Sequence, residues 1–234
     1  MVEMKKSTLF SILTIVILIP ATLWLGTILP GRWYYLTSTM IIIETMLPFF
    51  FLFETRKPQA RELVTIAVMC ALATVSRVAF AFLPGFKPIT GIIMIAGIAF
   101  GAEAGFMTGA ISAFASNFFY SQGPWTPWQM MAYGFGGFLA GLTFHRRRGK
   151  TNPMVLAVFG FLAVAFVVGP LLDCCTVFTS LTTFTTEAVL LVFARGFLYN
   201  INHGVSCAVT MLVFSKPLLE KLDRLKVKYG MLEV

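Results

Sequence analysis

The chain has 234 residues, a formal net charge of +8 and a mean hydropathy of +0.84. With 58% hydrophobic and 12% charged residues, it cannot be a soluble globular protein with a polar coat, and the composition indicates an integral membrane protein. The positive charge does not indicate nucleic-acid binding, because most basic residues fall into clusters separated by long apolar runs. The clusters lie at Lys5–Lys6, Arg56–Arg61, Arg146–Lys150 and Lys216–Lys228.

The first 55 residues contain two apolar runs and are predicted to form a separate two-helix membrane extension. Its helices are expected at residues 7–29, with a kink at Pro20, and at residues 38–54. Glu44 lies inside the second helix, and the sequence gives it no role. A charged segment at 55–61 then separates this extension, residues 1–55, from a core at residues 56–234.

The core is predicted to contain six further helices, which makes the chain an all-α integral membrane protein with eight crossings. These helices are expected at residues 62–83, 90–101, 103–120, 127–144, 153–170 and 187–215. Residues 171–186 are expected to be a loop, and a basic tail follows the last helix. The helix at 90–101 reaches only about 18 Å, short of a ~30 Å hydrocarbon core, so it must start within the preceding loop, tilt or be partly re-entrant.

The basic clusters predict the orientation of the chain in the cell membrane. Eight crossings put every cluster on one side, and the positive-inside rule makes that side cytoplasmic. Both termini are therefore expected in the cytoplasm, and the loops at 84–90, 121–126 and 171–186 outside.

The sequence contains no recognisable catalytic or metal-binding set. His145 belongs to a basic loop, His203 lies within a helix, and no cysteine spacing resembles a zinc site. Gly149-Lys150-Thr151 resembles the end of a phosphate-binding loop, but Phe144 stands where its first glycine should be. We therefore expect no enzyme activity, no cofactor and no ATPase site in this chain.

The segment SNFFYSQGPWTPWQMMAY, residues 116–133, predicts a binding rim between two helices. It is unusually rich in aromatic and amide side chains, and Thr126 and Pro127 suit an N-cap and first helical turn. Other polar residues in apolar segments are expected to converge on this rim, because polar groups buried in a membrane are costly and mark functional sites. The predicted substrate-binding residues are Arg77, Lys87, Thr90, Asn117, Tyr120, Gln122, Trp125, Trp128, Gln129, Asp173, Arg195, Tyr199 and Asn202.

Some of these residues have alternative interpretations. Arg195 could extend to the membrane surface or pair with Glu187 or Asp173, and the same structural alternatives apply to Arg77. Asn202 and His203 could simply form hydrogen bonds between helices.

Small residues predict close helix packing. Ala67 and Ala71 lie one turn apart and either pack inside the bundle or dock on a partner membrane protein. A second group of small residues is expected to pack the core internally: Gly97, Gly101, Gly105, Gly109, Ala113, Gly134, Gly137 and Gly141.

Residues 60–216 resemble the substrate-binding S component of energy-coupling factor (ECF) vitamin transporters. The resemblance rests on RELVTIAVMCALATVSRVAF, on FKPITGIIMIAGIAFGAEAGFMTGAISAFASNFF and on QGPWTPWQMMAYGFGGFLAG. The GPWTPWQ run is similar to the cobalamin-specific subgroup, whereas the first 55 residues are an addition to the usual six helices.

This resemblance implies a division of labour. The chain would capture the vitamin cobalamin outside the cell, with pantothenate or riboflavin as alternative vitamins. Ala67 and Ala71 would dock on a transmembrane T subunit that carries two cytoplasmic ATPases. The competing hypotheses are a self-sufficient secondary transporter and an intramembrane enzyme.

Overall fold

The computed structural model describes residues 6–28, 34–147 and 151–230. Within these ranges the chain forms eight helical rods and no strand, as the sequence predicts. Five of the rods are long and apolar enough to cross a membrane. Two parts of the predicted basic clusters, Lys5 and Arg148–Lys150, lie outside the described residues.

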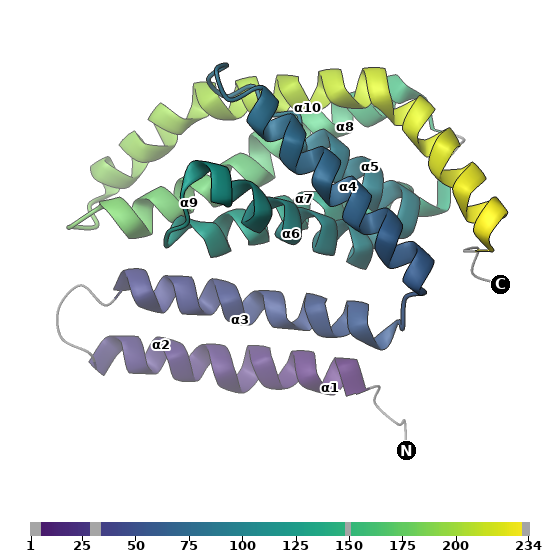
Figure 1. Ribbon diagram of the computed structural model, residues 1–234. Helices are drawn as coiled ribbons and strands as arrows, with labels where there is room; N and C mark the ends of the chain where they lie inside the picture. Colours follow the sequence, from purple (N-terminus) through teal and green to yellow (C-terminus); the bar gives the residue numbers. More distant parts are fainter. Residues whose placement is uncertain (1–5, 29–33, 148–150, 231–234) are drawn as a thin grey trace.

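The N-terminal extension is a helical hairpin that lies along one side of the core (Figure 1). Its first rod joins α1 (Lys6–Leu13), the π-helical turn η1 (Thr14–Leu18) and α2 (Ile19–Ile28). Its second rod, α3 (Tyr34–Thr55), begins four residues earlier than predicted and lies between the first rod and the core.

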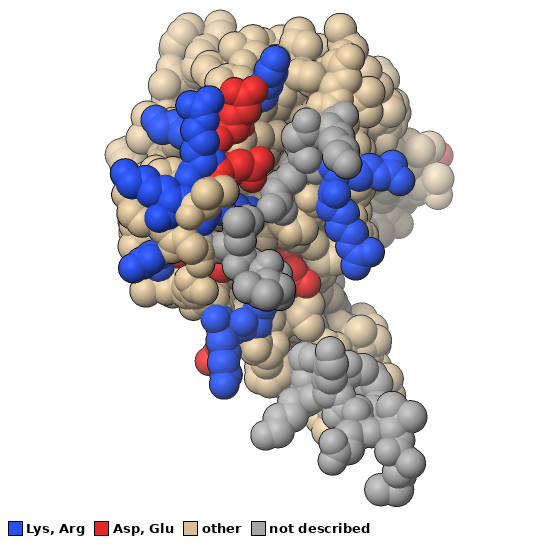
Figure 2. Space-filling view, turned by 90° about the vertical axis from the view of Figure 1, so that its right-hand side faces the viewer, with Lys and Arg blue, Asp and Glu red and all other residues tan. Residues whose placement is uncertain are grey.

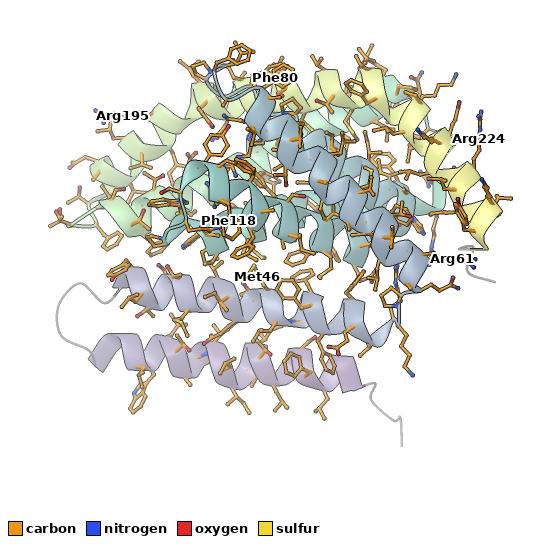
Figure 3. All side chains as sticks on the ribbon, viewed as in Figure 1. Met46, Arg61, Phe80, Phe118, Arg195 and Arg224 are labelled. Atoms are coloured by element: carbon orange, nitrogen blue, oxygen red, sulfur yellow. The ribbon has the colours of Figure 1, made fainter. Side chains whose placement is uncertain are left out.

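Aromatic packing joins α3 to the core. The ring of Phe49 stacks on Phe106 with centroids 4.1 Å apart and meets the edge of Phe138 at 5.1 Å. Met46, labelled in Figure 3, is buried beside them. Aromatic and methionine side chains thus fill this part of the interface.

The next four helices match the predicted ones within four residues at each end. They are α4 (Ala60–Ala79), α5 (Ile89–Phe100), α6 (Ala102–Tyr120) and α7 (Trp125–Phe144). Every residue of the short α5 is buried, so its length need not match the bilayer, because neighbouring helices enclose it.

Glycines allow α5, α6 and α7 to pack backbone against backbone. A Cβ atom added at Gly97 or at Gly105 would overlap the backbone of Gly137, and one added at Gly109 would overlap Gly134. The internal packing predicted for these glycines is confirmed.

The last two rods are longer than predicted. The seventh consists of α8 (Pro153–Ala163), the π-helical turn η3 (Val164–Val168) and α9 (Gly169–Ser180), so the expected end near residue 170 and the loop from 171 are wrong. Pro170 stands two residues after the end of the π-helical turn, at the start of α9, where the altered hydrogen-bond pattern accommodates its missing N–H.

The eighth rod, α10 (Thr186–Tyr229), also extends beyond its predicted end. It continues through the region expected to be a basic tail, because Leu219 and Leu222 are buried against the core. The charge pattern alone predicted an exposed tail. The segment is instead helical and packed on the core, because its leucines lie on one face of the helix.

Basic side chains gather at one end of the molecule, which we call the basic end (Figure 2). Figure 3 places Arg61 and Arg224 there and Arg195 at the opposite end, which we call the far end. The far end carries the loop Phe80–Pro88 and the turn Ser121–Pro124.

Three side chains at the basic end cap the buried C-terminus of α5. Arg56 Nη1 donates to Phe100 O over 2.8 Å, His145 Nδ1 lies 2.9 Å from Ile98 O, and Lys226 Nζ donates to Ala99 O. Arg56 also forms an ion pair with Glu62. These contacts supply donors to carbonyls that a helix end leaves unpaired, and place positive charge at the negative end of its dipole.

Candidate functional site

Arg77, in the last turn of α4, is the centre of a polar network at the far end. Its side chain is only 6% exposed, and Nη1 donates to Ser116 Oγ over 2.5 Å and to Asn117 Oδ1 over 3.0 Å. Nη2 donates to Gln129 Oε1 over 3.4 Å. The guanidinium therefore ties α4 to α6 and α7 through uncharged acceptors.

Two tyrosine rings complete the surroundings of Arg77. The guanidinium carbon lies 4.7 Å from the ring centroid of Tyr120 and 5.7 Å from that of Tyr133. Tyr120 Oη donates to Arg77 O over 2.8 Å. The rings stabilise the buried cation through their negative faces.

Lys87 places a second positive charge beside Arg77 and Tyr120. Its Nζ lies 5.2 Å from the ring centroid of Tyr120, and the side chain is 8% exposed. Burial, and then the positive charge of Arg77, lowers the pKa of Lys87. Two like charges thus face one aromatic ring, and Arg77 Nε is buried without an acceptor. An electron-rich ligand oxygen would satisfy this arrangement.

Thr126 organises the turn below this cluster. Its hydroxyl accepts from Asn117 Nδ2 at 3.0 Å and from Gly123 N at 3.2 Å, and donates to Gln122 Oε1 at 2.9 Å. The prediction that Thr126 caps a helix is wrong, because α7 begins one residue before it, at Trp125. Thr126 instead orients the amide of Asn117 towards Arg77.

Thr90 and His203 join α5 to α10 next to Tyr133. Thr90 Oγ1 and His203 Nε2 are 2.5 Å apart and both side chains are fully buried. The ring of Tyr133 meets the edge of the imidazole at 5.9 Å. The interhelical role considered for His203 is confirmed, and its contact with Tyr133 links this pair to the Arg77 cluster.

The loop Phe80–Pro88 carries Lys87 to the cluster and rests on α10. Gly85 has φ +75°, and a Cβ atom there would lie 2.9 Å from Asn202 Cβ and 3.3 Å from Tyr199 O. Only glycine allows this approach without strain. Tyr199 and Asn202 themselves are exposed beside the loop.

Four predicted residues lie in other surroundings. The Nε1 of Trp125 donates to Ser121 O over 3.3 Å, and the ring of Trp128 stacks on Phe178 at 5.7 Å. Asp173 accepts from Asn200 Nδ2 at 2.6 Å, which joins α9 to α10. Arg195 is exposed on α10 (Figure 3).

Sequence reasoning missed Ser116 and Tyr133 and misassigned Thr126. Tyr133 stands four residues after Gln129, so helical periodicity could have placed both on one face of α7. Ser116 directly precedes Asn117, but nothing in the sequence indicates that both accept from the same nitrogen.

Ala67 and Ala71 are exposed on α4, whereas Ala73 is fully buried. Packing inside this chain is therefore excluded for the first two alanines. Their neighbours Val64, Val68 and Val75 are also exposed, so the helix presents an apolar face with small residues at its centre.

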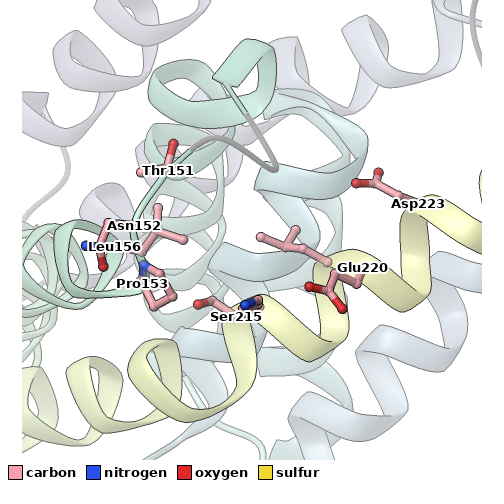
Figure 4. Close-up of a pocket in the computed structure, with 9 residues that line it drawn as sticks. Thr151, Asn152, Pro153, Leu156, Ser215, Glu220 and Asp223 are labelled. Carbon is pink, nitrogen blue, oxygen red and sulfur yellow. The ribbon is translucent and has the colours of Figure 1, made fainter.

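A separate hollow of about 410 Å³ lies at the basic end, between the start of α8 and α10 (Figure 4). Asn152 caps α8 there, accepting from Met154 N at 2.9 Å. The lining includes Lys216, Glu220 and Asp223, a mixture of charges. It shares no residue with the predicted site.

Residues 57–220 match the family described as "ECF-type riboflavin transporter, S component". The match covers more than two thirds of the chain, begins after the N-terminal extension and ends within α10. Neither the curated proteins nor the solved structures gave a match.

Proposed function

Because the chain belongs to the family of S components of ECF-type riboflavin transporters, we propose that it captures riboflavin for an ATP-driven importer. It is a transport subunit and not an enzyme. The family match favours riboflavin, an alternative in the sequence analysis, over cobalamin. The GPWTPWQ run is a poor guide to the vitamin because Thr126 and Gly123 are engaged in hydrogen bonds within the turn itself.

The proposed vitamin site is the Arg77 cluster, and the observation that carries it is a buried cation surrounded by neutral acceptors and tyrosine rings. Riboflavin has a flat fused-ring system with carbonyl oxygens and a polyol chain. Its carbonyls would accept from Arg77 and Lys87, and its ring would pack against Tyr120 or Tyr133. The hydroxyls would suit the amides of Asn117 and Gln129.

Three further predicted residues would form the outer part of this site: Tyr199 and Asn202 of α10, which lie beside the loop Phe80–Pro88, and Gln122 of the turn. We leave Trp125, Trp128, Asp173 and Arg195 out of the proposed site because they lie in the other surroundings described above. Because Arg77 and Lys87 are buried, the loop Phe80–Pro88 must move away from α10 before the vitamin can reach them. This loop would act as the lid of the site.

The charge distribution supports an orientation with the basic end in the cytoplasm and the far end outside. In this arrangement both termini are cytoplasmic and the eight rods cross the cell membrane, with α5 enclosed by the others. The extension, residues 1–55, would be a separate membrane unit beside the core of residues 56–234.

The exposed face around Ala67 and Ala71 would dock on a transmembrane T subunit carrying two ATPases. We expect Ala71→Trp to abolish riboflavin uptake in cells that also produce these partners, while leaving riboflavin binding intact. Ala194→Trp, which enlarges an exposed alanine of α10, is the matched control and should transport normally. Normal uptake by Ala71→Trp would show that the docking face lies elsewhere.

The function itself is tested by purifying the chain from cells grown with riboflavin and recording its absorption spectrum. A bound flavin should give the yellow flavin bands, and the T subunit and both ATPases should co-purify when they are produced together. Uptake by this chain alone, in liposomes with an ion gradient, would instead support a secondary transporter.

A further inference from the structure

A chain of hydrogen bonds leads from the turn before α7 to the guanidinium of Arg77. Gln122 Nε2 donates to Phe114 O over 2.9 Å, and Gln122 Oε1 accepts from Thr126 Oγ1 at 2.9 Å. Thr126 Oγ1 accepts in turn from Asn117 Nδ2 at 3.0 Å, and Asn117 Oδ1 accepts from Arg77 Nη1 at 3.0 Å. Three side chains thus connect the exposed turn to the buried cation.

The two ends of this chain fix the direction of every bond in it. A backbone carbonyl such as Phe114 O can only accept, so the amide of Gln122 turns Nε2 towards it and Oε1 towards Thr126. The guanidinium of Arg77 can only donate, so the amide of Asn117 turns Oδ1 towards it and Nδ2 towards Thr126. The hydroxyl of Thr126 must therefore donate to Gln122 and accept from Asn117.

Thr126 has no hydrogen-bonding capacity left for a ligand. A hydroxyl has one donor and two acceptor positions. The remaining acceptor position is filled by Gly123 N, which donates to Thr126 Oγ1 over 3.2 Å, and the side chain is only 5% exposed. Thr126 can therefore influence a bound vitamin only through its neighbours.

Arg77 depends on such neighbours for its position. Its acceptors are the uncharged groups of Ser116, Asn117 and Gln129, which hold it less strongly than a carboxylate would. Asn117 is fully buried, and without an acceptor on Thr126 its amide would be free to rotate. A rotated amide would present its N–H groups to a guanidinium that cannot accept them.

We propose that Thr126 is a positioning residue for vitamin binding: it sets the orientation of Asn117 and thereby holds Arg77 where a ligand oxygen can accept from it. The proposal rests on the proposed function, because it takes the Arg77 cluster as the riboflavin site. The same bonds support the turn, in which Ser121 has φ +80°, a conformation that residues other than glycine rarely adopt. The turn and the guanidinium thus share one network.

The test compares variants of Thr126 in a fluorescence titration of riboflavin with purified full-length protein. Thr126→Val removes the hydroxyl at nearly constant side-chain size and should bind riboflavin about tenfold more weakly than the wild type. Thr126→Ala, a second variant without the hydroxyl, should show the same loss. Thr126→Ser restores the hydroxyl and should bind within about twofold of the wild type.

Thr143→Val is the matched control on the same helix. Thr143 is exposed, and its hydroxyl donates to Leu139 O within α7 over 2.8 Å. The same substitution there should leave riboflavin affinity unchanged, because Thr143 has no bond to the network.

A double-mutant cycle separates positioning from a merely structural role. If Thr126 acts through Arg77, Thr126→Val should weaken riboflavin binding by no more than about twofold in the Arg77→Gln background. A merely structural role would weaken binding by the same factor in both backgrounds. That result, or wild-type affinity of Thr126→Val and Thr126→Ala, would overturn the proposal while Arg77→Gln still binds weakly. A wild type that does not bind riboflavin would refute the proposed function itself, and the positioning role with it.

Discussion

The two ends of the bundle hold their cations in different ways. At the basic end, Arg56 and Lys226 donate to backbone carbonyls of α5, and Arg56 also pairs with the carboxylate of Glu62. At the far end, Arg77 donates to hydroxyl and amide oxygens and lies over tyrosine rings. Lys87 adds a second positive charge there.

From this difference we infer that the cations of the basic end are structural, whereas Arg77 is proposed to bind the ligand. The carbonyls at the C-terminus of α5 carry the negative end of the helix dipole, so the cations of the basic end have a fixed counterpart. The acceptors around Arg77 are neutral, so its charge remains available to a ligand oxygen. Substitutions at the two ends should therefore affect different properties.

The largest expected effect on riboflavin affinity comes from Arg77→Gln. It removes charge-assisted hydrogen bonds worth about 2–3 kcal/mol to the ligand, which weakens binding roughly 30- to 150-fold. The affinity is measured by titrating riboflavin fluorescence with purified protein. Arg224→Gln, which removes an exposed cation at the basic end, is the control and should bind like the wild type. If the two variants bound riboflavin equally well, Arg77 would not be part of the binding site.

A smaller effect is expected from Gly85→Ala, which disturbs the closed position of the lid. At φ +75° a side chain costs about 1–2 kcal/mol, and the new Cβ would press on Asn202. Riboflavin should dissociate about tenfold faster, while the association rate changes less. Stopped-flow fluorescence measures both rates. Unchanged dissociation would show that this loop does not close the site.

Tyr120→Phe should weaken riboflavin binding only about two- to fivefold. It removes the hydrogen bond to Arg77 O but keeps the ring that faces both cations. Tyr120→Leu, which removes the ring as well, should be clearly weaker in the same titration. If both variants bind equally, the ring contributes nothing to the site.

Lys226→Met should leave riboflavin affinity unchanged and lower stability instead. The carbonyl of Ala99 loses its side-chain donor, which costs about 1–3 kcal/mol. Thermal unfolding in detergent should show a lower Tm at the same riboflavin Kd. A loss of affinity at unchanged Tm would assign the basic end to the binding site.

The sequence predicted the helices of the core well where apolar runs end in charged or turn residues, as at Arg56–Arg61. It failed at Pro170, because a π-helical turn keeps the helix going past the proline, and at Leu219 and Leu222, whose burial depends on tertiary packing. The spacing of apolar residues along the sequence predicts neither a π-helical turn nor burial that depends on tertiary packing.

The proposed site could be outlined from the sequence only in part, for a similar reason. Arg77, Asn117 and Tyr120 could be identified because polar groups in apolar helices require partners. Their actual partners could not be identified, since Thr126 and Tyr133 acquire their roles only when α6 and α7 pack together. The vitamin could not be inferred from the GPWTPWQ turn, whose threonine bonds within the turn.

The central claim is that this chain binds riboflavin at the Arg77 cluster. The most direct test is a fluorescence titration of riboflavin with the purified full-length protein, repeated in the presence of excess cobalamin. The account predicts saturable quenching of riboflavin by the wild type, unaffected by cobalamin and strongly weakened in Arg77→Gln. Absence of quenching, or displacement of riboflavin by cobalamin, would contradict it.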